Sequence, residues 1–329
     1  MKVLVTGATS LLGGRVVQRL QARGDDVTVL QRRPSGLAVR EVLGDIADHR
    51  AVATAVLGAD IVIHAAAKVT VMGPWPEFAA TNIAGTENVL DAARTAGVRQ
   101  FVYISSPSVA HSGASLVGAP AGPADPDRAR DNYSRSKASG ELLALAADGN
   151  DFSVVAVRPH LVWGPGDEQL IGRIVARARQ GRLAVIGSGA ALVDTTYVDN
   201  AADAIVAAGD RARELRGRAF VVSNGQPRPV RELLNRITIA AGLEPPRLRV
   251  PVVMARSAGS VLERVWKRTH RADDPPITRF LAEQLSTAHW FDQRETRAAL
   301  NWQPTVSLDE GFARVAAWFG ASPVTSAAD

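Results

Sequence analysis

The chain has 329 residues, of which 46% are hydrophobic and 22% are charged. This composition is typical of a globular protein that is large enough for one sizeable core, or for a large domain with a smaller one. The lack of cysteine excludes disulfides and cysteine-ligated metals, and we expect no metal site. The net charge is +5, but the arginines are scattered along the chain, which argues against nucleic acid as a partner.

The N-terminal segment and the apolar runs indicate the cellular compartment of the protein. Residues 1–7 are too short for the apolar region of a signal peptide, and a glycine turn ends them. No apolar run approaches the roughly 20 residues that cross a bilayer. We therefore expect a soluble, cytoplasmic protein.

Short apolar runs alternate with amphipathic stretches over residues 1–160. Strands are predicted over residues 2–6, 26–30, 40–43, 61–65, 100–105 and 153–158, and helices over 11–23, 48–57, 77–96 and 131–147. Strands made of continuous Val, Ile and Leu are typical of a parallel sheet that is covered on both faces. The alternation predicts an α/β protein with a doubly wound, Rossmann-like parallel sheet.

After Gly164 short strands mix with helices. Strands are predicted over residues 184–186 and 219–222, and helices over 169–180, 200–213 and 230–241, with Asp199 placed to cap the second of these helices. We expect a dinucleotide-binding domain over residues 1–160, with elements returning from about 190–225. A smaller mixed C-terminal substrate-binding lobe should span residues 161–320, and residues 321–329 should form a disordered tail.

A basic amphipathic helix is predicted over residues 252–270. Four roles are open for it: a lid over a long acyl chain, a helix on a membrane surface, a contact face for another enzyme of the same pathway, or an ordinary packed helix. The last role needs no further assumption.

A glycine turn follows the first predicted strand, in the sequence Thr6-Gly7-Ala8-Thr9-Ser10-Leu11-Leu12-Gly13. Gly7 permits a tight turn, Gly13 permits close packing of helix on strand, and the free N–H groups of the helix N-terminus suit a pyrophosphate. The predicted cofactor-binding residues here are Gly7, Ser10, Leu11, Leu12 and Gly13. The alternative is a glycine turn of the kind found in any strand-to-helix connection.

The end of the second predicted strand indicates which nicotinamide cofactor is used. Enzymes that use NAD place an acidic residue there for the ribose diol, whereas this chain has Gln31, Arg32 and Arg33. Guanidinium groups form bidentate, charge-assisted bonds to phosphate, so the pattern favours the 2′-phosphate of NADP(H). The alternative is a solvated basic turn.

The fourth predicted strand ends in His64, Ala65 and Ala66. The small side chains of Ala65 and Ala66 let the backbone lie against a cofactor. His64 is expected to be a hydrogen-bonded core histidine rather than a catalytic residue.

The most specific signal is Tyr133-Ser134-Arg135-Ser136-Lys137. Residues four apart share one face of a helix, which brings an ammonium near a phenol. A nearby cation is expected to lower the tyrosine pKa, as acid–base catalysis near neutral pH requires. Lys137 is also able to hold the nicotinamide ribose. The alternative is an exposed helical pair.

Hydroxyl side chains follow the fifth predicted strand at Ser105, Ser106 and Ser108. The carboxyl edge of a doubly wound sheet is where ligands bind, so one of these serines should bond a substrate carbonyl oxygen. Each of them is alternatively a simple strand-end cap.

Six segments appear in the order typical of extended short-chain dehydrogenases/reductases, namely residues 6–13, 44–46, 82–86, 105–106, 133–137 and 158–160. The chain resembles this family and departs from its pattern at Ser10, where a glycine is expected. The resemblance implies that Ser106 is the carbonyl-binding serine and that Asn82 steadies the active-site backbone and a water. It also implies that Asp45 and Ile46 meet the adenine, and that the protein is a homodimer.

A narrower resemblance covers the rest of the chain. Residues 158–167 and 192–200 resemble the 3β-hydroxysteroid dehydrogenase branch, and residues 222–227, 232–236, 278–281 and 284–290 resemble bacterial 2-alkyl-3-oxoalkanoate reductases of long-chain olefin synthesis. Pro159 and His160 are implied to lie at the cofactor, although a buried, hydrogen-bonded role is an equal alternative for His160.

The resemblance implies NADPH-dependent reduction of a hydrophobic β-keto acid, a 2-alkyl-3-oxoalkanoate, to the 3-hydroxy acid. A steroid or sterol 3β-dehydrogenase and a nucleotide-sugar epimerase or dehydratase are alternatives, and both are disfavoured because no acid follows Leu30. A regulator that senses NADP without turnover is a third alternative. The presence of Tyr133, Lys137 and Ser106 together argues against it.

Overall fold

The computed structural model of the chain describes residues 1–70, 73–111, 113–269 and 277–321. Residue 270, at the end of the predicted basic helix, and residues 322–329 of the predicted tail lie outside this set.

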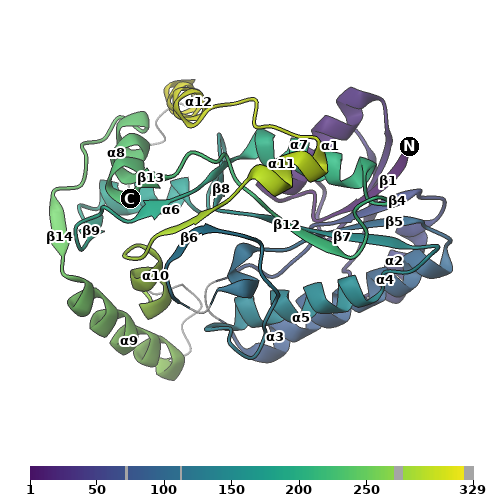
Figure 1. Cartoon of the computed structure of the whole chain (residues 1–329), viewed down its shortest axis with the longest axis horizontal. Helices are drawn as coiled ribbons and strands as arrows, with labels where there is room; N and C mark the ends of the chain where they lie inside the picture. The colour runs from purple at the N-terminus through teal and green to yellow at the C-terminus, as the bar shows by residue number, and fades with distance from the viewer. Residues whose placement is uncertain (71–72, 112, 270–276, 322–329) are drawn as a thin grey trace.

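Seven strands form the central sheet, in the spatial order β3-β2-β1-β4-β5-β7-β12 (Figure 1). Their bounds are β1 (Lys2–Thr6), β2 (Asp26–Gln31), β3 (Arg40–Leu43), β4 (Ile61–His64), β5 (Gln100–Ile104), β7 (Ser153–Pro159) and β12 (Arg218–Val222). Every neighbouring pair is parallel. The apolar side chains of the central strands are buried on both faces, as a sheet between two helical layers requires. The predicted doubly wound sheet is confirmed.

Two groups of helices cover the sheet (Figure 1). Helices α1 (Leu11–Arg23) and α7 (Val198–Asp210) lie on one face, and α2 (His49–Val56), α4 (Gly85–Thr95) and α5 (Asn132–Ala146) lie on the other. The strand order reverses between β1 and β4, so the loops after these two strands diverge and open a crevice at the carboxyl edge of the sheet.

Asp199 lies inside α7 rather than before it. The helix begins at Val198, and the residue before it makes no side-chain capping bond. The Asp199 carboxylate instead pairs with Arg15 of α1 at 3.0 Å and with Arg314, near the C-terminus, at 3.1 Å. The predicted capping role of Asp199 was wrong. The helix starts earlier than its apolar periodicity indicates, so Asp199 lies in its first turn and the carboxylate points toward the neighbouring helix α1.

The helix predicted over residues 77–96 is interrupted. It consists of α3 (Trp75–Ala79), a π-helical turn η1 (Ala80–Ala84) and α4. The Asn82 side chain, at the centre of the π turn, accepts a bond from the Lys68 amide at 2.7 Å and donates one to the Lys68 carbonyl at 3.1 Å. Such turns are frequent at functional sites, and periodicity alone does not reveal the extra residue that they insert.

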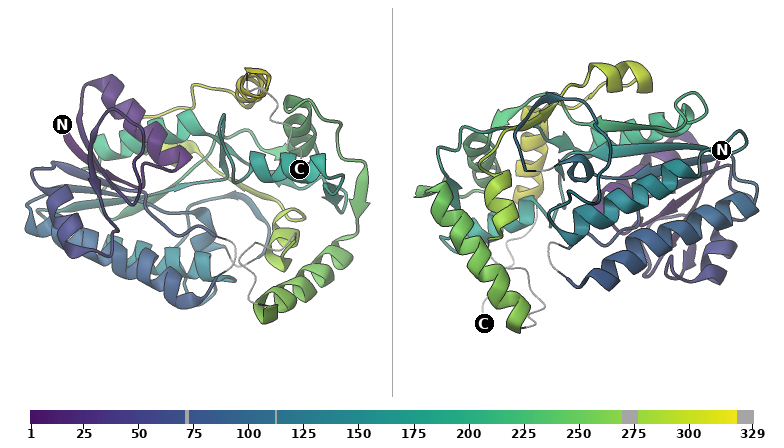
Figure 2. Two further views of the ribbon diagram at one scale, coloured as in Figure 1. Left: turned by 180° about the vertical axis from the view of Figure 1, so that it is seen from behind. Right: turned by 60° about the horizontal axis from the view of Figure 1, so that its bottom comes forward.

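A smaller mixed lobe lies beside the large sheet (Figure 2). Its strands are paired in the orders β13-β10-β15-β6, β11-β8 and β14-β9. Their bounds are β6 (Leu116–Ala119), β8 (Val162–Trp163), β9 (Ala184–Ile186), β10 (Leu192–Val193), β11 (Thr196–Tyr197), β13 (Arg228–Pro229), β14 (Leu248–Val250) and β15 (His289–Phe291). The strand β6 belongs to the first 160 residues of the chain, yet it pairs with β15 of this lobe.

The remaining helical segments are η2 (Pro107–Ala110), α6 (Ile171–Arg179), α8 (Val230–Ala240), α9 (Val252–Thr269), α10 (Arg279–Gln284), α11 (Arg294–Leu300) and α12 (Leu308–Ala321). Of these, α11 packs through Leu300 on the face of the large sheet that α1 and α7 cover. Apolar residues of α6, α8 and α12 pack around Trp163 and Tyr197 to form the core of the smaller lobe.

Helix α9 lies at the outer rim of the smaller lobe (Figure 2). It buries Ala255, whereas Met254, Val261 and Val265 have 63%, 55% and 43% of their surface exposed. The helix is therefore packed along one side and carries an exposed apolar strip along another. Within the described parts of the chain, no helix is both long and apolar enough to cross a membrane.

Gly140→Ala should destabilise the protein, because α5 approaches the π turn at this glycine. An added Cβ would lie 2.5 Å from both the Asn82 carbonyl oxygen and the Tyr103 hydroxyl. We expect the free energy of unfolding to fall by about 1–3 kcal/mol, despite the better helix propensity of alanine. Urea unfolding tests this, with Ser139→Ala on the same helix as the control that should change stability by less than about 0.5 kcal/mol. A Gly140→Ala protein as stable as wild type would show that the two segments are not in contact.

Candidate active site

The glycine turn packs directly against the end of β4. Gly7 has a φ of +78°, and an added Cβ there would lie 2.7 Å from the Ala66 amide nitrogen. At Gly13 a Cβ would lie 2.3 Å from the Gly7 carbonyl oxygen. Only glycine fits these two positions, and the tight turn leaves the start of α1 at the crevice between β1 and β4.

Ser10 is the N-cap of α1. Its hydroxyl accepts a bond from the Gly13 amide at 3.1 Å and donates one to the Gly7 carbonyl at 2.9 Å. The residue that departs from the family pattern therefore holds the turn together. Leu11 and Leu12 follow as the first residues of the helix and are half-buried. The turn and the helix N-terminus fit the pyrophosphate of a dinucleotide.

The tip of β2 carries two exposed guanidinium groups, those of Arg32 and Arg33. Arg32 lies 4.0 Å from the Asp45 carboxylate, and their side chains are 77% and 47% exposed. A pair with this exposure is weak, so a phosphate is able to displace it. Gln31 is buried and donates to Glu41 at 3.2 Å, so its side chain faces β3.

Ile46, Ala65 and Ala66, three further predicted cofactor contacts, differ in which of their atoms a cofactor can reach. Ile46 is 5% exposed and its side chain packs in the core between α2 and α4, so only its main chain is available to an adenine. Ala65 and Ala66 are half-buried at the end of β4, beside the glycine turn. His64 is bonded on both ring nitrogens, to Thr6 at 2.8 Å and to Thr86 at 3.1 Å, which confirms its structural role.

Helix α5 presents Tyr133 and Lys137 from successive turns. Asp131 caps the helix by accepting from the Ser134 amide at 2.8 Å. The Lys137 ammonium donates to the Ile104 carbonyl at 2.6 Å and lies 4.1 Å from the centre of the Tyr103 ring. Burial lowers the Lys137 pKa to about 7, although Glu141, one turn further on, acts to raise it.

Burial raises the Tyr133 pKa to about 12, and a hydrogen bond with Ser106 acts in the opposite direction. The predicted lowering of this pKa by Lys137 is therefore not found. The reason is that the Lys137 ammonium is bonded to a main-chain carbonyl of β5, while the half-buried phenol is partly withdrawn from water. A neutral phenol is the protonation state that a proton donor needs.

The structure distinguishes between the three candidate serines. Ser106 bonds with Tyr133 and accepts from the Ser108 hydroxyl at 3.0 Å. The Ser105 hydroxyl is buried and has no hydrogen-bond partner among the described residues. Ser106 is thus the serine that meets the tyrosine, and Ser108 supports it.

Asn82 reaches α5 as well as Lys68. Its amide group donates to the Ser136 hydroxyl at 2.8 Å, and Ser136 donates to the Tyr133 carbonyl at 2.9 Å. The π turn thereby fixes the first turn of α5, on which Tyr133 lies. This agrees with the backbone-steadying role that the family resemblance implies for Asn82.

A buried ion pair that the sequence analysis missed holds α5 to the end of β7. The Arg158 guanidinium donates to Glu141 at 2.8 Å, and the two side chains are 1% and 0% exposed. Arg158 also donates to the Gly122 carbonyl at 2.9 Å. The spacing of Lys137 and Glu141 on one helix face offered a signal, but nothing local pointed to Arg158. Pro159 and His160 follow Arg158, at the end of β7.

An apolar cavity of about 270 Å³, the inner chamber, opens beside Tyr133, Ser106 and Ser108. Its walls come from both lobes and include Leu116, Trp163, Leu233, Phe291 and Phe312. Trp163 is 1% exposed, which confirms the expected place in the core or pocket wall.

Three histidines that are far apart in the sequence meet in the inner chamber. They are His111, His160 and His289, and the ring centres of His160 and His289 are 5.4 Å apart. Burial lowers the pKa of all three below the usual value, so they are neutral near pH 7. Of the three, only His160 was predicted from the sequence to lie near the cofactor.

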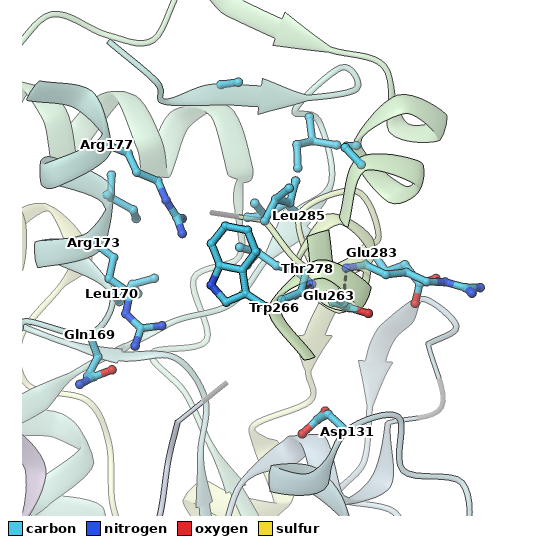
Figure 3. Close-up of a pocket in the computed structure, with 18 of the residues that line it drawn as sticks. Asp131, Gln169, Leu170, Arg173, Arg177, Glu263, Trp266, Thr278, Glu283 and Leu285 are labelled. Atoms are coloured by element: carbon cyan, nitrogen blue, oxygen red, sulfur yellow. Dashed lines mark hydrogen bonds and ion pairs between the residues drawn. The ribbon is translucent and has the colours of Figure 1, made fainter. Parts of the chain in front are cut away.

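A larger cavity of about 1450 Å³, the outer cavity, lies between Tyr133 and the helices α6, α9 and α10. Figure 3 shows Arg173 and Arg177, both from α6, pointing into it toward the indole ring of Trp266. Tyr133 therefore stands between two cavities of different character.

The fold and this arrangement of glycine turn, tyrosine, lysine and serine define a nicotinamide-dependent oxidoreductase. Residues 3–223 match the NAD dependent epimerase/dehydratase family, and the chain belongs to this family of extended short-chain dehydrogenases/reductases. The predicted family is confirmed, and with it the assignment as an NAD(P)-dependent oxidoreductase.

The relatives that the chain resembles include two reductases. It is 39% identical to the 2-alkyl-3-oxoalkanoate reductase of Stenotrophomonas maltophilia (strain K279a), over 96% of this chain and 99% of that protein. It is 36% identical to the protein of the same name from Shewanella oneidensis, over 95% and 85% of the two chains. A solved dTDP-glucose 4,6-dehydratase of Streptomyces venezuelae, DesIV, shares the fold with a TM-score of 0.76 at 23% identity, over 98% of each chain.

Lys137→Met should stabilise the protein most near pH 7 and less as the pH rises. Burial lowers the Lys137 pKa from 10.5 to about 7, so between these values the unfolded chain binds a proton that the native protein does not. Native wild type therefore gains stability relative to the variant as the pH rises, by at most about 1.4 kcal/mol per pH unit. Urea unfolding of both proteins between about pH 7 and pH 9 measures this. A stability difference that does not change with pH would contradict the account of Lys137.

Proposed function

We propose that this protein reduces a 2-alkyl-3-oxoalkanoate to the corresponding 3-hydroxy acid with NADPH. The observation that carries the proposal is the position of Tyr133 and Ser106 at the mouth of an uncharged, apolar chamber. A ketone with a long alkyl arm suits this combination, because the arm is buried while its oxygen meets two hydroxyl groups. The similarity to the two named reductases supports the same substrate class.

The proposed roles follow from the geometry of α5 and β5. Ser106 and Tyr133 donate hydrogen bonds to the ketone oxygen, which polarises the carbonyl group. NADPH, when bound, supplies the hydride that reduces the carbonyl carbon. Tyr133 transfers its phenolic proton to the oxygen as that hydride arrives, since its raised pKa keeps it protonated beforehand. A proton from solvent then replaces the one that Tyr133 has transferred.

The proposed cofactor site runs from Arg32 and Arg33 to the inner chamber. The pyrophosphate lies at the N-terminus of α1, next to Gly7, Ser10 and Gly13. The 2′-phosphate meets Arg32 and Arg33, whose exposure leaves them accessible. Asp45 and the main chain of Ile46 face the adenine, and Lys137 holds the nicotinamide ribose near Pro159 and His160.

The wider setting of the enzyme is part of the same proposal. We place it in the cytoplasm, as a homodimer that acts on a hydrophobic small molecule. The exposed apolar strip of α9, with Met254, Val261 and Val265, is the proposed contact with a membrane surface or with another enzyme of the pathway.

Tyr133→Phe should lower kcat for keto-acid reduction by at least about 100-fold, because the ketone loses its proton donor. The affinity for NADPH should stay unchanged, which a fluorescence titration measures. Tyr197→Phe, which changes a buried tyrosine of the smaller lobe, is the matched control and should retain activity.

The assay panel comprises a 2-alkyl-3-oxoalkanoate, a 3-ketosteroid and UDP-glucose. Turnover by Tyr133→Phe at the wild-type rate, or wild-type preference for another member of the panel, would refute the proposal.

Removal of both guanidinium groups in Arg32→Ala/Arg33→Ala should weaken NADPH binding by roughly 10- to 100-fold. The affinity for NADH should change little, because that cofactor has no 2′-phosphate. Arg50→Ala, an exposed arginine of α2, is the control. Equal losses for the two cofactors would show that these arginines do not read the phosphate.

A further inference from the structure

Tyr133 stands at a wall that the inner chamber and the outer cavity share. Six residues line both spaces, namely Tyr133, Leu170, Ile174, Leu234, Leu281 and Leu285. A ketone whose oxygen is bonded to Tyr133 therefore lies at the boundary between a space of about 270 Å³ and one of about 1450 Å³. Its two substituents are directed into different spaces, because the carbonyl carbon holds them on opposite sides of the oxygen.

The two substituents of the ketone in a 2-alkyl-3-oxoalkanoate differ in polarity. On one side of the ketone, the arm that begins at C4 is a hydrocarbon without charge. On the other side, C2 carries both the carboxylate and the second alkyl chain. The charge of the groups that line each space therefore indicates which substituent enters it.

The inner chamber offers no cation to a carboxylate. Among the described residues, it is lined by no aspartate, glutamate, lysine or arginine. Burial lowers the pKa of its three histidines, so each ring is neutral near pH 7 and has one N–H group. His111 and His289 donate theirs to main-chain carbonyls at 3.0 Å and 2.7 Å, and His160 is bonded to the main chain of Asp194. A carboxylate in this chamber would lose hydration without gaining a cation, which is costly.

The outer cavity is lined in part by charged side chains, among them Arg130, Arg279 and Glu283, which are paired with one another. A carboxylate placed in this larger space is able to keep part of its hydration, because the walls are polar and there is room for water. The C2 side of the substrate fits the outer cavity, and the C4 arm fits the inner chamber.

Helix α8 borders both spaces. Leu234 lines both of them, whereas Leu233 and Ile237 line the inner chamber alone. The Leu233 side chain lies about 100° around the helix axis from that of Leu234, so it faces the chamber away from the shared wall. Trp163 and Phe312, whose rings are stacked at 4.5 Å, also line the inner chamber alone. These four side chains bound the part of the chamber that the outer cavity does not reach.

We infer that the inner chamber binds the hydrocarbon arm that begins at C4 and that Leu233 limits the length of this arm, while the carboxylate and the alkyl chain at C2 lie in the outer cavity. The inference rests on the proposed function and extends it to a residue that selects chain length. An apolar arm gains affinity with each methylene group that it buries, until it meets a packed wall.

The test uses two series of stable 2-alkyl-3-hydroxyalkanoates, oxidised with NADP⁺. One series lengthens the C4 arm, and the other lengthens the alkyl chain at C2. In the C4 series of wild type, kcat/KM should rise by up to roughly fourfold per added methylene group and then fall once the arm reaches the wall.

Variants of Leu233 should move this length limit in opposite directions. Leu233→Phe should lower kcat/KM for the longest C4 arm that wild type accepts by roughly 10-fold. Leu233→Ala should move the limit to longer arms, because it enlarges the chamber. Both variants should leave the C2 series as it is in wild type.

Ile239→Phe is the matched control, since Ile239 lies on the same helix but is 60% exposed and is not part of the described lining of either space. It should behave as wild type in both series. The NADPH affinity of each variant reports whether it is folded. If Leu233→Ala does not fold, Phe312→Leu takes its place as the variant that enlarges the chamber.

An unchanged C4 limit in folded Leu233 variants would overturn the inference and leave the ketoreductase proposal intact. A shift of the C2 series instead, or equal shifts of both series, would also overturn it, because the chamber would then not distinguish the two arms.

If wild type oxidises no compound of either series, the proposed function fails by itself. Binding of straight-chain methyl ketones to the NADPH complex, followed by the fluorescence of the bound NADPH, then decides the inference separately. A length limit that Leu233→Phe shortens supports the chamber as the site of a hydrocarbon arm, and an absent or unchanged limit contradicts it.

Discussion

The burial of one ammonium group, that of Lys137, is the constraint on which the site depends. Moving a cation out of water is costly unless its donors are bonded. Here the Ile104 carbonyl and the face of the Tyr103 ring offset part of that cost, and both come from β5. The ammonium therefore fixes how α5 is rotated against β5. As a result Tyr133, one turn earlier on the helix, meets Ser106, two residues beyond Ile104.

Features with a local cause were predictable from the sequence. Continuous apolar runs located the strands of the large sheet, and the four-residue spacing of Tyr133 and Lys137 placed both on one helix face. Features that depend on a distant partner were not. The π turn around Asn82 depends on Lys68, and Asp199 is drawn to Arg15 of another helix. The protonation of Tyr133 depends on its burial, which sequence spacing does not report.

In the smaller lobe, the difference between features with a local cause and features that depend on a distant partner is larger. Its helices α6 and α8 follow from amphipathic periodicity, whereas β6 pairs with β15 across a long stretch of chain. His111, His160 and His289 meet only because of that pairing and the end of β7. The groups proposed to carry out the reaction thus lie on regular elements of the sheet domain. The walls of the inner chamber are assembled by contacts between segments that no local motif connects.

The central claim is that a ketone held by Tyr133 and Ser106 is reduced at the carboxyl edge of the sheet. Its most direct test is a single turnover with NADPH deuterated at both C4 positions and a 2-alkyl-3-oxoalkanoate, followed by mass spectrometry of the product. The account predicts a 3-hydroxy acid that carries one deuterium, bonded to C3. A 3-hydroxy acid without deuterium, or a keto acid left unreduced while NADPH is bound, would contradict it.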